Sequence, residues 1–94
     1  MQNQRKEVLK LLENIKSDKS IIFTKHALTR MKARNIAKKE VLENILNPKR
    51  LMYTTPQGKN KYNCYFIENT RIYHRYILII KNKVIVVTVM KIMN

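Results

Sequence analysis

The sequence predicts a single domain over residues 1–94 of the α+β class, with two or three N-terminal helices packed on an antiparallel sheet of three or four strands. The first half of the chain places apolar residues at the spacing of helices. The second half consists of runs rich in Tyr, Ile and Val, separated by short polar breaks, which is typical of strands. A chain of 94 residues, 45% of them hydrophobic, can bury one modest core.

Three helices are expected, over residues 3–17, 24–34 and 38–46. Asn3 is suited to cap the first helix, and Thr24, which follows the β-like residues 21–23, is suited to cap the second. Asn35 fits the position after the second helix, because Asn tolerates the left-handed conformation that often ends a helix. The third helix is expected to stop at Asn47–Pro48.

Strands are expected at about 61–68, 71–80 and 83–92, with an optional strand at 50–54 and a loop at 54–60. Residues 77–80 and 84–90 are apolar on both faces, so these strands should be central and covered by helices on one side. The other face then needs a further cover or a partner subunit, which leaves a homodimer open. Thr88 interrupts an apolar run, and its hydroxyl needs a partner, either backbone or a site at the end of the sheet.

The charge balance predicts an anionic partner. Twenty Lys and Arg face six Asp and Glu, a formal net charge of +14, and this density of like charge opposes folding. Nucleic acid is the first candidate, an acidic protein the second and an anionic membrane surface the third. The alternative is that the lysines only solvate the surface.

The single cysteine and the polar N-terminus argue against a disulfide-bonded, metal-binding, secreted or membrane protein. Cys64 is the only cysteine, so no internal disulfide can form, and no Cys/His cluster has metal spacing. No metal or cofactor is therefore expected. The N-terminus is polar and the longest apolar runs are far short of a membrane span, so we expect no signal peptide, no membrane segment and a cytoplasmic protein.

The segment "FTKHALTRMKARNI" at residues 23–36 is basic and contains no acid. On its helix, His26, Arg30 and Arg34 recur every four positions and line one stripe, which Lys25 and Lys32 flank with further positive charge. Like charges at this spacing repel, and a bridging anion would reverse that effect. The simpler interpretation is that His26 is a half-buried residue at the helix start, bonded to backbone.

The strand segment "RIYHRY" interleaves basic and aromatic residues. Alternation puts Ile72, His74 and Tyr76 on one face and Arg71, Tyr73 and Arg75 on the other. This pattern suits RNA, because Tyr can stack on an unpaired base and Arg can hold a phosphate. The simpler interpretation is that these are ordinary exposed strand residues.

Residues 23–48 and the terminal strand "VIVVTVM" at 84–90 resemble an uncharacterised family, domain of unknown function 4258. That family carries an F/H-T-x-H-A-x-x-R-M-x-x-R-x-I signature, a helix ending in N-P and a last strand close to V-V-T-V, and the likeness spans roughly residues 21–92. The family is similar to the RelE, BrnT and colicin-D group of small ribonucleases, often toxins with a dedicated antitoxin. The resemblance implies a RelE/BrnT-like fold and puts the family's polar positions on His26, Arg30, Arg34 and Thr88. Asn35 replaces the family's usual glycine, and Ala37 its usual Ser or Thr.

Together these observations predict an RNA-binding protein that is a metal-independent ribonuclease of toxin type. The expected catalytic residues are His26, Arg30, Arg34, His74 and Thr88, with the two histidines as acid and base if folding brings them within one phosphodiester of each other. The expected nucleic-acid-binding residues are Lys25, Arg30, Lys32, Arg34, Arg71, Tyr73 and Arg75. The expected partners are RNA and an acidic antitoxin. The alternative is a non-catalytic module on the same fold that binds nucleic acid or an acidic protein.

Overall fold

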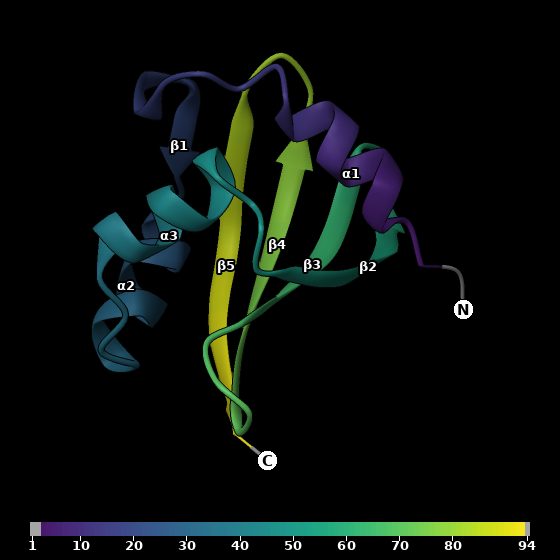
Figure 1. The fold of residues 1–94 in the computed structure, drawn as a ribbon. Helices are drawn as coiled ribbons and strands as arrows, with labels where there is room; N and C mark the ends of the chain where they lie inside the picture. The colour runs from purple at the N-terminus through teal and green to yellow at the C-terminus, as the bar shows by residue number, and fades with distance from the viewer. Residues whose placement is uncertain (1–2, 94) are drawn as a thin grey trace.

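The computed structural model describes residues 3–93, so residues 1–2 and 94 of the predicted domain lie outside it (Figure 1). The elements in chain order are α1 (Arg5–Leu12), the 3-10 helix η1 (Asp18–Ser20), β1 (Ile21–Phe23), α2 (Lys25–Ala33), α3 (Lys38–Leu46), β2 (Leu51–Gly58), β3 (Lys61–Ile67), β4 (Ile72–Ile80) and β5 (Val84–Met93). The α+β class is confirmed, with three α-helices in the described chain. None of the described helices is both long and apolar enough to span a bilayer.

The sheet differs from the one predicted. It has five strands in the order β1-β5-β4-β3-β2, and β1 pairs with β5 in parallel, Ile22 opposite Ile85. The prediction of three or four purely antiparallel strands is therefore not confirmed. The difference arises from β1, whose three apolar residues are too few to show the alternation of a strand. The sequence therefore indicated only an extended segment before the next helix.

Strand β2 is longer than expected and replaces most of the predicted loop at 54–60. Pro56 lies inside it, which is tolerated because β2 is an edge strand and one side of its backbone needs no sheet partner. The hairpin then turns over residues 59–60, where Asn60 adopts φ 57°. The predicted loop is thus reduced to a tight turn.

Helix ends follow the local chemistry. The Thr24 hydroxyl accepts a hydrogen bond from the Ala27 amide at 3.0 Å, as expected of an N-cap, and donates to the Val87 carbonyl at 2.8 Å. Asn35 has φ 55°, the left-handed conformation expected after α2. The first helix is shorter than predicted, and Asn3 precedes its cap; the Asn3 side chain instead accepts from the amides of Arg5 and Thr54, which ties α1 to β2.

The core lies between the helices and one face of the sheet (Figure 1). Strand residues buried on this face include Cys64, Phe66, Tyr76, Leu78, Ile80, Val84, Val86 and Val89, and helix residues buried against them include Val8, Leu12, Ala27, Met31, Val41 and Ile45. Strands β4 and β5 are central, as the two-sided apolar pattern predicted. Burial raises the pKa of the Cys64 thiol to about 12, so this cysteine is an inert core residue.

The opposite face of the sheet carries no helix within the described residues. Cross-strand register defines it as four rows: Ile67–Tyr73–Ile92, Tyr53–Tyr65–Arg75–Met90, Thr55–Asn63–Ile77–Thr88 and Lys61–Ile79–Ile85–Ile22. We call this surface the open face. Most of its side chains are half-buried, because the neighbouring strands shield them partly.

Candidate nucleic-acid interface

The second of the four rows brings together two tyrosines and an arginine from three strands. Tyr53 of β2 pairs with Tyr65 of β3, and Tyr65 pairs with Arg75 of β4. The two tyrosine rings are stacked, with centroids 4.4 Å apart and planes at 14°. The Arg75 Nη2 donates to the Met90 sulfur at 2.8 Å. We call Tyr53, Tyr65, Arg75 and Met90 the aromatic row.

Arg75 is a half-buried cation without a carboxylate partner among the described residues. Its Nε is enclosed and makes no hydrogen bond. Removing a charged group from water without a counter-charge costs free energy, which an anionic ligand would recover. A guanidinium is also the side chain best shaped to hold phosphate. The position of Arg75 therefore favours an anion on the open face.

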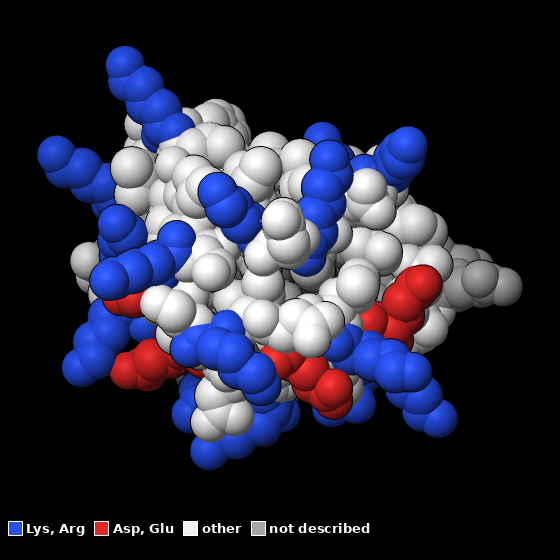
Figure 2. Space-filling view, turned by 90° about the horizontal axis from the view of Figure 1, so that it is seen from above, with Lys and Arg blue, Asp and Glu red and all other residues white. Residues whose placement is uncertain are grey.

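No acid opposes such a ligand on the sheet. All six Asp and Glu of the sequence lie in helices or connecting segments, and none lies in a strand. In Figure 2, Lys and Arg project from most of the outline, whereas the acidic side chains in view lie in its lower half. The open face is thus free of the groups that would repel a polyanion.

The predicted stripe on α2 lies at the surface. His26, Arg30 and Arg34 are exposed and form no ion pair with any described residue, and Lys25 and Lys32 beside them are exposed as well. His26 also makes no side-chain hydrogen bond in the described chain, unlike the half-buried, backbone-bonded histidine of the simpler interpretation. Arg34 is the C-cap, one residue beyond the helix.

Strand β5 contacts the residue that caps α2 and also carries Thr88 of the open face. The Thr24 amide donates to the Val86 carbonyl at 3.1 Å and the Thr24 hydroxyl to the Val87 carbonyl at 2.8 Å, so α2 begins against this part of β5. The next residue of β5, Thr88, is 9% exposed and pairs with Ile77 on the open face, beside the aromatic row. Thr24, at the start of α2, therefore lies within hydrogen-bond distance of the two β5 residues that precede Thr88.

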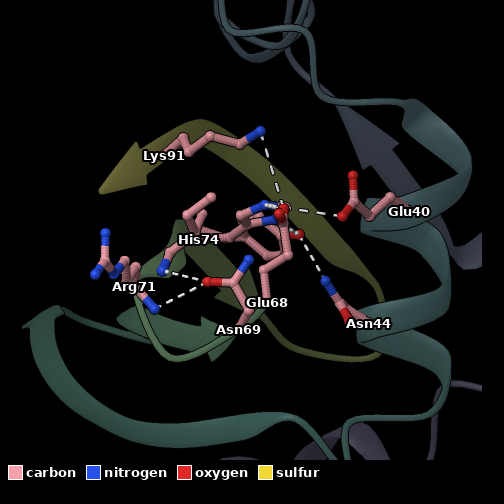
Figure 3. Close-up of polar contacts among 9 residues, drawn as sticks. Glu40, Asn44, Glu68, Asn69, Arg71, His74 and Lys91 are labelled. Atoms are coloured by element: carbon pink, nitrogen blue, oxygen red, sulfur yellow. Dashed lines mark hydrogen bonds and ion pairs between the residues drawn. The ribbon is translucent and has the colours of Figure 1, made fainter. Parts of the chain in front are cut away.

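His74 is in a different environment, on the helix-covered face (Figure 3). Its side chain is 1% exposed, with Nε2 2.7 Å from the Glu68 carboxylate and Nδ1 3.0 Å from the Tyr76 hydroxyl. The Asn44 amide donates to the same hydroxyl at 2.9 Å. Every group is satisfied if the Tyr76 hydroxyl donates to Nδ1 and Nε2–H donates to Glu68. Burial raises the pKa of Tyr76, which keeps this hydroxyl protonated.

The surroundings of His74 decide what this cluster can do. Glu40 lies 3.8 Å from Nε2, and donor atoms of Glu40, Glu68 and His74 lie within 4.8 Å of one another, close enough to hold a cation. However, the Lys91 ammonium, 3.9 Å from Glu68, already supplies positive charge, and Nε2 is committed to Glu68. We interpret the cluster as a structural connection between α3, β4 and the turn after β3.

The structure does not bring the two histidines together through any described contact. Both ring nitrogens of His74 are occupied by Glu68 and Tyr76, whereas His26 is exposed on α2. His74 is closed to a substrate in this conformation. The strand alternation correctly predicted that His74 and Tyr76 share one face, but no local pattern indicated that Asn44 of α3 would donate to the Tyr76 hydroxyl.

The remaining predicted residues lie at the rim or on the open face. Arg71 is exposed in the turn between β3 and β4, where the Asn69 side chain accepts from its amide at 2.8 Å. Tyr73 lies on the open face, in the row next to the aromatic row. Sequence reasoning missed Tyr53 and Tyr65, which become a pair only through the register of β2 with β3.

Comparison with known proteins places most of the chain in one family. The model of the family described as Domain of unknown function (DUF4258) matches residues 23–91. No curated protein and no solved structure matches the chain. The matched range contains α2, β4 with Arg75, and Thr88 of β5, and it leaves out α1.

Proposed function

The chain belongs to the family Domain of unknown function (DUF4258), whose description assigns no activity, and we propose from its geometry that it is an RNA-binding protein and a metal-independent ribonuclease. The observation that supports this most is Arg75, a half-buried cation without a carboxylate partner among the described residues, on a sheet face without acids. A likeness to the RelE/BrnT toxins, an acidic antitoxin as partner, a homodimer and a cytoplasmic location stay predictions.

RNA suits this surface because it offers phosphates at regular intervals. One phosphate would sit at Arg75, and further phosphates would follow at Arg30 and Arg34 on α2, beside His26. The net charge of +14 raises the local concentration of a polyanion and speeds its association. Lys25 and Lys32 extend the field beside the stripe.

The chemistry needs no metal, because RNA carries its own nucleophile, the 2′-hydroxyl. In the proposed mechanism His26 removes the proton from that hydroxyl as a general base. The 2′-oxygen bonds to the adjacent phosphorus, the bond between phosphorus and the 5′-oxygen breaks, and the 5′-oxygen takes a proton from water. Arg30 and Arg34 offset the negative charge that grows on the phosphorane. Thr88 orients the phosphate at the end of the stripe, and His74 acts only by fixing β4.

The experiment that tests the proposal is incubation of the purified protein with end-labelled RNA in EDTA, over a series of salt concentrations. We expect fragments ending in 2′,3′-cyclic phosphate, because the 2′-oxygen attacks the adjacent phosphorus. We also expect log Kd to change with log salt with a slope of magnitude about 0.7 for each phosphate contact on a single strand.

Two other outcomes separate the alternatives. Intact RNA that is shifted on a gel, with the same salt dependence, would identify a non-catalytic nucleic-acid-binding module. RNA that is neither cut nor shifted at low salt would contradict the proposal and leave an acidic protein as the partner.

A further inference from the structure

The stacked pair Tyr53 and Tyr65 has no role in phosphate binding or proton transfer. Tyr53 is 39% exposed although it is a large aromatic residue, and its ring lies flat against that of Tyr65. The pair does not belong to the core, which lies on the other face of the sheet. An exposed aromatic stack beside an arginine without a carboxylate partner calls for a ligand with both a π-face and an anionic group.

We infer that the aromatic row binds unpaired nucleobases, so that the RNA taken by this protein is single-stranded where it crosses the sheet. This inference rests on the proposed function. Neighbouring strands lie about 4.8 Å apart, so Arg75 is one strand away from Tyr65. A nucleotide laid across the row can place its base on a tyrosine and its phosphate on Arg75.

A duplex cannot make these two contacts at once. In an A-form helix the bases are stacked inside and only phosphates and sugar edges reach a flat protein surface. An unpaired strand can splay its bases onto aromatic side chains, and such stacking tolerates any base because every base has a π-face. The aromatic row should therefore prefer single-stranded RNA to duplex RNA, with little preference for base sequence.

The charges on the open face argue against a second copy as the occupant. A two-fold contact through this face would enclose the Arg75 and Lys61 residues of both copies, and the four rows hold no acid to neutralise them. A nucleic acid brings the missing negative charge.

The test measures binding to 2′-O-methyl RNA, which lacks the nucleophile and cannot be cut. The probes are a labelled strand of about 10 nucleotides, the same strand annealed to its complement, and the same strand with abasic sugars at its centre. We expect the intact single strand to bind more tightly than both other probes. In the double variant Tyr53→Ala, Tyr65→Ala, the affinity for the intact strand should fall by a factor on the order of 10–100 and become equal to that for the abasic strand.

Matched variants separate stacking from other effects. The pair Tyr53→Phe, Tyr65→Phe keeps both rings and should restore most of the affinity that the alanine pair loses. Leu46→Ala removes an exposed apolar side chain on the helix side and should also leave binding unchanged.

The outcomes distinguish this inference from the proposed function. Equal affinity of the parent for all three probes would overturn the inference while leaving RNA binding intact. Absence of binding to every probe at low salt would contradict the proposed function itself. A dimer that must dissociate before RNA binds, detected by light scattering, would make a second copy the occupant and would also overturn the inference.

Discussion

Cleavage of RNA by a His26→Ala variant is expected to be slower than cleavage by the parent by a factor on the order of 10²–10⁴, the usual contribution of general acid–base catalysis. The reason is that His26 is the only described histidine with free ring nitrogens at the basic surface, since His74 is closed by Glu68 and Tyr76. The measurement is the initial rate with labelled RNA in EDTA, together with affinity for 2′-O-methyl RNA. The affinity should change little, because the arginines that hold phosphate remain.

The controls come from the same helix. Thr29→Ala changes another exposed residue of α2 and should leave the cleavage rate unchanged. Because His26 is exposed and forms no ion pair among the described residues, its replacement should alter the free energy of unfolding by no more than about 0.5 kcal/mol. If the His26→Ala protein cuts RNA as fast as the parent, His26 is not the base.

Replacing His74 should instead affect stability. We expect His74→Ala to lower the free energy of unfolding by about 3–5 kcal/mol, because the change opens a cavity, leaves the Tyr76 hydroxyl without its acceptor and removes a hydrogen bond from the Glu68 carboxylate. Urea unfolding followed by circular dichroism measures this loss. Tyr76→Phe removes one hydroxyl and two hydrogen bonds and should cost about 1–3 kcal/mol.

The two histidine variants serve as controls for each other. His26→Ala should lose cleavage and keep stability, whereas His74→Ala should lose stability and, at a temperature where it is still folded, keep its affinity for RNA. A His74→Ala protein as stable as the parent would show that the described cluster does not hold β4 to α3. Loss of RNA affinity in folded His74→Ala would place this histidine in the binding site after all.

Local patterns in the sequence were enough to predict features that depend on a few neighbouring residues. The Thr24 cap and the left-handed Asn35 follow from the chemistry of single side chains at helix ends. The alternation in β4 correctly separated His74 from Arg75, because the two faces of a strand are fixed by its period.

Features that depend on which segments meet could not be predicted in this way. The parallel pairing of Ile22 with Ile85 and the stacking of Tyr53 on Tyr65 are consequences of register between distant parts of the chain. The same holds for Asn44, which reaches His74 only through Tyr76 after α3 has packed on the sheet. The pattern of a short segment does not identify its partner, because many pairings would satisfy the same hydrophobic pattern.

Binding of RNA to the acid-free open face through Arg75 should be visible in the salt dependence with which the variant Arg75→Gln binds single-stranded RNA. We expect weaker binding at low salt and a log–log slope whose magnitude is smaller by about 0.7, the loss of one phosphate contact. Lys10→Gln on α1 makes the same change of charge on the helix side and should leave the slope unchanged. An Arg75→Gln protein with the affinity and salt dependence of the parent would contradict binding through Arg75.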